Sequence, residues 1–249
     1  MIQNSFIFLD KISAKKEQLL WQSGITNWDR FLEADGIKGV SKARKSFYDL
    51  QIKRAKQAIA ENNSSHFIKK LPSHENWRLY DFFKDECCFL DIETNGIGPG
   101  SYITVIGMFD GYDTKTMIQG MNFSRDELKK ELSKYKMIVT FNGAAFDLPF
   151  IEKRYPGLLP NIPNFDLKHA CARLGLTGGL KNIEKLLDIN RTKAVSGIDG
   201  GDAYRLWRMY RASGNDYYLK LLIEYNEEDC VNLKQIADYV VRELKKIFI

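Results

Sequence analysis

Apolar residues recur at helical spacing over the first third of the chain, and the pattern changes to short apolar runs after residue 86. The helical spacing predicts three helices, over 13–23, 28–34 and 42–61. Four Asn and Ser residues at 62–65 end the third helix. We therefore expect a helical domain over 1–70, joined by a connector over 71–86 to a second domain.

Compact apolar runs in the second domain predict strands at 87–92, 102–109, 114–119, 137–141 and 164–167. Helical patterns lie between and after them, at 124–135, 146–154, 167–174, 180–187, 202–213 and 215–247. Strands followed by strands that alternate with helices indicate an α/β domain with a mixed β-sheet flanked by helices. This domain is expected over 87–249.

Two acidic residues share one face of the first predicted strand. Residues i and i+2 of a strand point to the same side, so Asp91 and Glu93 point together while Leu90 and Ile92 point into the core. Two like charges at the end of an apolar strand repel each other unless a cation lies between them. Hard divalent cations such as Mg²⁺ favour this oxygen-only setting.

Two further stretches carry acids in apolar settings. Asp147 follows an apolar strand and a small-residue loop, at the start of a predicted helix, where it could equally be an ordinary helix cap. Tyr225 and Asp229 are four residues apart and share one face of a helix. Glu227 and Glu228 lie off that face and are expected to be solvated.

Taken together, the acids Asp91, Glu93, Asp147 and Asp229 predict a site for two divalent cations, Mg²⁺ or Mn²⁺. In two-metal sites the ions lie roughly 3.5–4 Å apart and stabilise the attacking and leaving oxygens of a phosphodiester. A tyrosine one turn from a metal-binding Asp, here Tyr225, is placed to orient the attacking water.

These motifs resemble those of the DEDDy-type 3′–5′ exonucleases, which have RNase H-like folds and include the proofreading domains of family B DNA polymerases. The resemblance is carried by Asp91-x-Glu93, by Asn142 with Phe146-Asp147, and by Tyr225-xxx-Asp229. The segments between them are similar to the YprB-like family, through 164–169, 180–184, 201–203 and 206–207.

The resemblance implies a role for each matching residue. Asp91, Glu93, Asp147 and Asp229 would be the metal ligands, and Tyr225 would position the nucleophilic water. Four further residues would lie near the 3′-terminal nucleotide: Thr94, Asn95, Asn142 and Phe146. The implied reaction is metal-dependent hydrolysis at the free 3′ end of a single strand, with DNA favoured over RNA as partner.

The first part of the chain resembles a nucleic-acid binding element and has an excess of basic side chains. Residues 6–25 resemble a helix-hairpin-helix element in which Lys11-Ile12-Ser13 replaces the two usual hairpin glycines. Residues 1–86 carry 15 basic and 11 acidic side chains. The basic face that includes Lys42, Arg44 and Lys45 is either a nucleic-acid contact or an ordinary solvated helix face.

Composition narrows the class of protein. The 249 residues are 44% hydrophobic and 28% charged, which is typical of a globular protein. No apolar run approaches the roughly 18 residues of a membrane span, and the first residues lack the pattern of a signal peptide. The four cysteines have no metal-binding spacing, so we expect reduced thiols in a cytoplasmic protein.

Two other functions stay open at this point. The same chemistry could act on RNA, as a 3′–5′ exoribonuclease, because the residue that would read the 2′-hydroxyl is not evident. The chain could also be a non-catalytic nucleic-acid binding module on an RNase H-like scaffold. Residues 191–196, between two predicted helices, are either a mobile substrate loop or a plain connector.

Overall fold

The computed structural model describes residues 1–248, so Ile249 at the end of the predicted second domain lies outside the described residues. The three predicted front helices are present as α1 (Ala14–Gln22), α2 (Trp28–Glu33) and α3 (Lys42–Ala60). Each begins after a polar residue whose side chain accepts a backbone N–H of the first turn: Ser13, Asn27 and Ser41.

The stretch 6–25 differs from the expected helix-hairpin-helix element, because α1 is its one helix and residues 7–11 form turns. The segment before α1 is held by burial rather than by helical hydrogen bonds. Phe6, Phe8 and Leu9 are buried, and the Glu17 carboxylate accepts the backbone N–H groups of Phe6 and Ile7. The aromatic side chains therefore anchor an irregular segment in place of a first helix.

The predicted connector is a packed helical segment. It contains the short helices η3 (Ser73–Leu79), α4 (Tyr80–Phe83) and η4 (Lys84–Glu86), after η2 (Ser64–Phe67). Arg78 is fully buried and forms ion pairs with Glu17, at 2.9 Å, and with Glu75, at 2.6 Å. Trp77 packs against Phe248 at the end of the chain. The front helices and the sheet domain therefore share one hydrophobic core.

Five strands form one mixed sheet in the order β3-β2-β1-β4-β5. They are β1 (Cys87–Thr94), β2 (Ile103–Phe109), β3 (Thr114–Ile118), β4 (Met137–Thr140) and β5 (Asn164–Asp166). The first three strands pair antiparallel, and β4 and β5 run parallel to β1. All five match strands predicted from the apolar runs.

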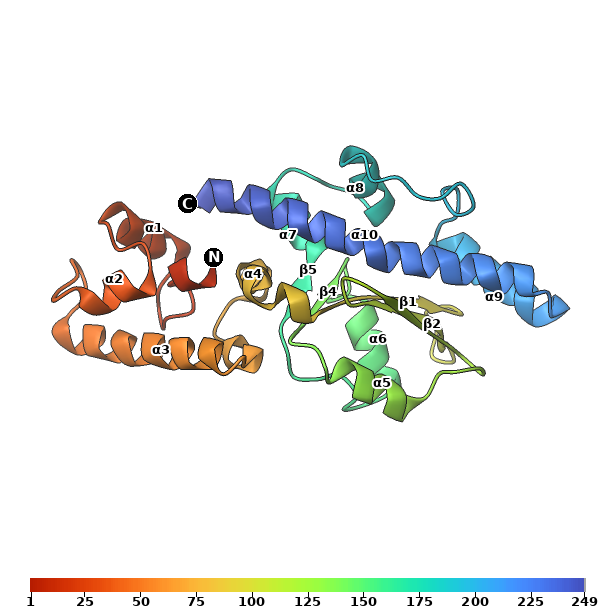
Figure 1. The fold of residues 1–249 in the computed structure, drawn as a ribbon, viewed down its shortest axis with the longest axis horizontal. Coiled ribbons are helices and arrows are strands. Elements are labelled where there is room, and N and C mark those ends of the chain that lie inside the picture. Colours follow the sequence, from red (N-terminus) through yellow and green to blue (C-terminus); the bar gives the residue numbers. More distant parts are fainter. Residues whose placement is uncertain (249) are drawn as a thin grey trace.

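Alternating side chains of β1 point to the two opposite faces of the sheet. Cys87 and Phe89 of β1 face α10 (Asp216–Phe248), whereas Cys88 and Leu90 face the opposite layer. That layer contains α5 (Arg125–Leu132) and α6 (Asp147–Arg154), as Figure 1 shows below the sheet. The fold is thus an α/β sheet with helices on both faces.

The remaining helices lie on the α10 side of the sheet (Figure 1). They are α7 (Leu167–Arg173), α8 (Leu180–Leu186) and α9 (Gly200–Ser213). The long helix α10 runs from α9 back to the front helices, so one helix spans the sheet and reaches the shared core. Within residues 1–248, no helix has the length and apolar character that crossing a membrane requires. All four cysteines are free and buried.

Candidate metal-dependent active site

The first two acids lie near the C-terminal end of β1, on the face of the strand that packs against α10. Asp91 and Glu93 share the face of Phe89, while Leu90 and Ile92 pack in the opposite core, as the strand alternation predicts. Asp91 lies beside Gly107 of β2 in the sheet register. A Cβ atom at Gly107 would come within 2.3 Å of Asn226 Oδ1, so the absent side chain lets α10 approach the sheet here.

Helix α10 supplies the third acid and a fixed contact to the first. Asn226 is buried and donates a hydrogen bond from Nδ2 to Asp91 Oδ2 at 2.8 Å. Asp229 and Tyr225 lie on the same side of the helix, both buried next to the sheet. Asn226 was not a predicted site residue. Its position in the chain between Tyr225 and Asp229 was the one feature of the sequence that could have indicated a role in the site.

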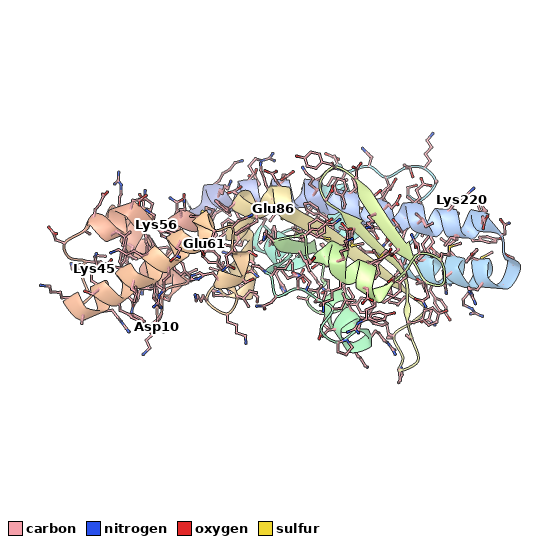
Figure 2. All side chains as sticks on the ribbon, turned by 60° about the horizontal axis from the view of Figure 1, so that its bottom comes forward. Asp10, Lys45, Lys56, Glu61, Glu86 and Lys220 are labelled. Carbon is pink, nitrogen blue, oxygen red and sulfur yellow. The ribbon has the colours of Figure 1, made fainter. Side chains whose placement is uncertain are left out.

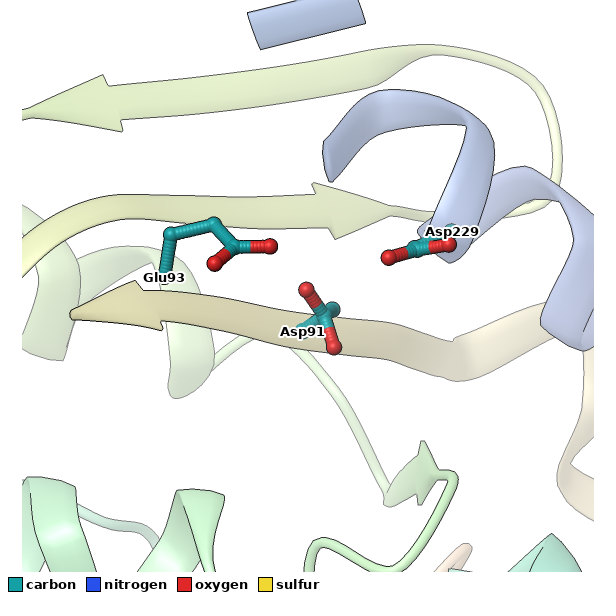
Figure 3. A group of neighbouring side chains, drawn as sticks. All are labelled: Asp91, Glu93 and Asp229. Carbon is teal, nitrogen blue, oxygen red and sulfur yellow. The ribbon is translucent and has the colours of Figure 1, made fainter. Parts of the chain in front are cut away.

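Three carboxylates converge from β1 and α10. One oxygen from each of Asp91, Glu93 and Asp229 lies within 4.8 Å of the others. Figure 3 shows the three side chains pointing toward a common space between strand and helix. Negative groups this close in a partly buried setting repel strongly without a positive partner. The arrangement fits a divalent cation held by oxygen ligands.

Asp147 joins this group from the other side of β1. It is buried at the first residue of α6, and its Oδ1 accepts the backbone N–H of Ile92 at 3.1 Å. The residue before the helix, Phe146, makes no side-chain cap, and the Asp147 carboxylate connects the start of α6 to β1. Asp147 lies in the same cavity as the three convergent acids but outside their tight cluster.

The loop between β4 and α6 is held by the carboxylate of Asp166. Asn142 has a positive φ of 64°, and its backbone N–H donates to Asp166 Oδ1 at 2.8 Å. The other oxygen of Asp166 accepts the N–H of Ala144. Lys168 Nζ donates to the Asn142 side chain at 3.1 Å. Asp166 thus positions Asn142, a support that the sequence reading did not identify.

Burial raises the pKa of every acid in the group. Desolvation, reinforced by the charge of Asp229, holds the pKa values of Asp91 and Glu93 well above their ordinary range. Desolvation raises the pKa of Asp147 to about 7 and that of Asp229 to about 6. Such shifts show that the protein surroundings alone do not stabilise the four charges.

Two positively charged side chains, Arg191 and Lys181, lie beside the acids, and neither was a predicted site residue. Arg191 donates to both Glu184 oxygens at 2.7 Å and to Asp229 Oδ1. The Arg191 guanidinium carbon lies 5.3 Å from the centroid of the Tyr225 ring, and Lys181 Nζ lies 5.2 Å from the same centroid. Arg191 was identified only as the start of a possible loop, because its partners are distant in sequence.

The segment 191–196 is attached to α10 through its first residues. The Thr192 backbone N–H donates to Glu228, and the Thr192 hydroxyl donates to Glu224. Glu227 accepts a hydrogen bond from Thr116 at 2.6 Å. Glu227 and Glu228 are therefore half-buried hydrogen-bond acceptors, and the expectation that both are solvated is wrong.

A cavity of about 420 Å³ connects the predicted site residues. Its lining includes most of them: Asp91, Glu93, Thr94, Asn142, Phe146, Asp147, Tyr225 and Asp229. Asn95 is not in the lining, since its side chain accepts the Tyr102 N–H at 2.6 Å and closes the turn after β1. The exposed apolar residues Ile97 and Tyr204 also line the cavity.

The basic residues predicted on the front helices lie elsewhere. Lys42, Arg44 and Lys45 begin α3, and Figure 2 shows Lys45 at one end of the molecule and Lys220 at the other. Lys45 is buried, and its Nζ contacts both oxygens of Asp49. Arg44 pairs with Asp10 at 3.5 Å. Lys45 is therefore not available to an external strand.

One family model, that of the RNase_H superfamily, matches residues 88–241. The chain belongs to the RNase_H superfamily. Members are typically nucleases that use divalent metals, and the convergent carboxylates of this chain agree with that chemistry. Searches of curated proteins and of solved structures find no significant match.

Proposed function

We propose that this protein is a metal-dependent 3′–5′ exonuclease that hydrolyses the terminal phosphodiester of single-stranded nucleic acid, with DNA as the favoured substrate. The observation that carries the proposal is the convergence of Asp91, Glu93 and Asp229 within 4.8 Å, beside Asp147 and Tyr225 in one cavity. Membership of a superfamily of nucleases supports the general class of reaction.

The four acids would hold two divalent cations, Mg²⁺ or Mn²⁺. Bound there, the cations would lower the pKa of the attacking water and stabilise charge on the leaving oxygen. The donor set consists of carboxylate oxygens, which is the chemistry that Mg²⁺ and Mn²⁺ prefer. The raised pKa values of Asp91 and Glu93 also support a bound cation, because it would remove the mutual repulsion of the acids.

The chain's own residues would bind and orient the reactants. Burial raises the pKa of Tyr225, so its hydroxyl keeps its proton and is suited to hold a water by a hydrogen bond. Phe146, Ile97 and Tyr204 provide apolar surface in the cavity against which a terminal base would pack. Asn142 offers its side chain at the edge of the same cavity.

The test is cleavage of 5′-labelled single-stranded DNA and RNA of the same sequence, in Mg²⁺, Mn²⁺ or EDTA. We expect a ladder that shortens from the 3′ end, requires metal and disappears with Asp91→Asn. Asp35→Asn, at an exposed acid in the loop between α2 and α3, is the matched control and should keep full activity. Cleavage that persists in EDTA or in Asp91→Asn would overturn the proposal.

The same assay separates the two sugars and the direction of attack. Faster cleavage of DNA than of RNA is the expected result. A DNA strand blocked by a 3′-phosphate should be resistant, whereas a strand blocked at its 5′ end should be degraded normally. Equal loss from both ends, or internal cuts, would show a nuclease of another type on the same metal site.

A further inference from the structure

A second cavity, of about 520 Å³, lies along the outer edge of β5. One wall is the segment 68–76, which follows the front helices, and the other is formed by 162–166 with the start of α7. Asn76 Nδ2 donates to the Asn164 carbonyl at 2.7 Å, and Ser65 donates to the Asn161 carbonyl. The front region and the sheet thus form this cleft together.

The cleft begins where the acidic site ends. Ala144 lines the cleft and Asn142 lines the acidic cavity, so the loop between β4 and α6 separates the two spaces. The Asp166 carboxylate accepts the N–H groups of both residues and fixes this boundary. The two spaces therefore lie on either side of this loop, and a strand that crosses the loop past Asn142 would reach the cleft.

Basic side chains gather along the cleft. Lys69, Lys70, His74 and His169 line it and are exposed, and the two lysines carry its positive charge. Lys70 Nζ lies 3.1 Å from both ring nitrogens of His66, so its nearest neighbour is a basic group. Within residues 1–248, neither Lys69 nor Lys70 forms a salt bridge. Two lysines without acidic partners in a cleft are suited to bind an anion.

The acid in the cleft lining is already engaged, since both oxygens of Asp166 accept backbone N–H groups. Glu75, between His74 and Asn76 in the chain, is not in the lining; it is buried and pairs with Arg78 and Arg173. Burial and the nearby charges of Lys70 and Arg54 lower the pKa of His66, which agrees with an excess of positive charge at this place. The cleft therefore presents a net positive surface to a ligand.

The backbone also favours a functional role for Lys69. Its φ is 61°, in the left-handed region that Gly or Asn adopts at lower cost. A lysine in such a conformation carries a strain of about 1 kcal/mol or more. The side chain at this position is therefore not explained by local folding.

We propose that the cleft binds the phosphodiester backbone of a single strand on the 5′ side of the terminal nucleotide. The proposal rests on the proposed exonuclease function, because that function places the 3′ end among Asp91, Glu93 and Asp229. Lys69 and Lys70 would pair with successive phosphates, and the half-buried apolar residues Pro72 and Ile162 would contact the bases. An acidic protein segment is the rival occupant.

Fluorescence anisotropy of 5′-labelled oligothymidylate, measured in EDTA on the full chain, tests the cleft without cleavage. The test pair is Lys69→Glu with Lys70→Glu. The control pair is Lys129→Glu with Lys130→Glu, two adjacent exposed lysines on α5, which packs on the other face of the sheet. We expect the test pair to weaken binding of a strand of about 12 nucleotides at least tenfold, and the control pair less than twofold.

Salt and length give two further readouts. Each phosphate contact on a single strand contributes a slope of about −0.7 in log K against log salt concentration. The test pair should reduce the slope by about 1.4, and should abolish the gain in affinity between a dinucleotide and the longer strand. If charge reversal disturbs folding, Lys69→Gln with Lys70→Gln removes the same two phosphate contacts, so it should reduce the slope by the same amount and weaken binding by a smaller factor. Equal behaviour of test and control pairs would overturn the proposal.

Two additional measurements distinguish the possible failures. Hydrolysis of the p-nitrophenyl ester of thymidine 5′-monophosphate by the wild type, in Mg²⁺ or Mn²⁺, requires the metal site alone. Its absence, together with no cleavage of strands, would refute the exonuclease, while anisotropy would still decide on the cleft. Displacement of the oligonucleotide by polyglutamate of equal charge would identify an acidic polypeptide as the occupant and would overturn the inference.

Discussion

Arg191 Nη2 donates hydrogen bonds to Asp229, one of the three convergent carboxylates, and to Glu184, and Arg191 Nε donates to the other oxygen of Glu184. The arginine is almost fully buried and joins an acid of the site to an acid of the core. Asn232 Nδ2 also donates to Glu184, so α10 holds both ends of this network. The Asp229 carboxylate is therefore oriented by a contact that lies 38 residues away in the chain.

Removal of this arginine should destabilise the protein. Arg191→Gln leaves Glu184 buried without its charge partner, and breaking a buried ion pair in this way costs about 3–5 kcal/mol. Urea denaturation in EDTA measures the change in the free energy of unfolding. Adding Glu184→Gln to Arg191→Gln should restore a large part of it, because both partners are then neutral.

The control for this experiment is an exposed pair of the same kind. Arg205 and Asp202 lie 3.0 Å apart on the surface of α9. Arg205→Gln should change the free energy of unfolding by less than about 1 kcal/mol. A comparable loss from both substitutions would mean that the buried network does not set the stability.

Tyr225→Phe should slow catalysis without removing the metal. The hydroxyl is the one group lost, so we expect kcat to fall by about 10- to 1,000-fold, as for other orienting hydrogen-bond donors. Metal affinity, measured by isothermal titration calorimetry, should change less than twofold. Tyr217→Phe, at an exposed position on the same helix, is the control and should leave kcat unaltered. Loss of metal binding in Tyr225→Phe would assign the tyrosine a different role.

The metal-free protein should lose stability as the pH rises from about 4 to about 7. Burial raises the pKa of Asp147 to about 7, so the folded state binds its proton more tightly than the unfolded chain does. Stability then falls with rising pH in the interval between the two pKa values. Thermal denaturation in EDTA should show Asp147→Asn more stable than wild type at pH 8 and equal to it at about pH 4.

Divalent cations should reverse this order. Metal binds the ionised carboxylates, so Mg²⁺ should stabilise the wild type increasingly at higher pH and Asp147→Asn much less. A wild type whose stability relative to Asp147→Asn does not depend on pH would contradict the raised pKa.

Gly107→Ala should disturb the site by separating α10 from β2. The added Cβ would lie 2.3 Å from Asn226 Oδ1 and 2.7 Å from Cys230 Sγ, so α10 must move away from β2. We expect a loss of about 1–3 kcal/mol in the free energy of unfolding. Metal affinity should fall as well, because Asp229 moves with the helix. Gly36→Ala, where no atom lies within 4 Å, is the control for both measurements.

Local patterns predicted most of the secondary structure. The three front helices, the five strands and the helices after β3 were all expected, with bounds that differ by a few residues. The segment 73–86 was not expected to be helical, because its short turns lack the length that helical periodicity needs. The burial of Arg78 there depends on Glu17, from a separate part of the chain.

The site also combines features that local spacing predicts with contacts that only folding creates. Asp91 and Glu93 could be placed on one face because strand alternation is local, and Tyr225 and Asp229 because helical spacing is local. Arg191, Glu184 and Asp166 could not be found, since each acts through a partner that only folding brings near. A hydrogen bond between distant residues leaves no periodic signal in the sequence.

By itself, the amino-acid sequence determined the type and order of the elements, the acids on each of them and the resemblance to a nuclease family. Those features depend on spacing within one element, where backbone geometry sets which side chains share a face. Only the tertiary structure decided that three acids meet within 4.8 Å, that Arg191 faces Asp229, and that the front region closes a basic cleft beside the site. These relationships depend on how α10 and the segment 68–76 pack on the sheet, which is set by contacts between residues far apart in the chain.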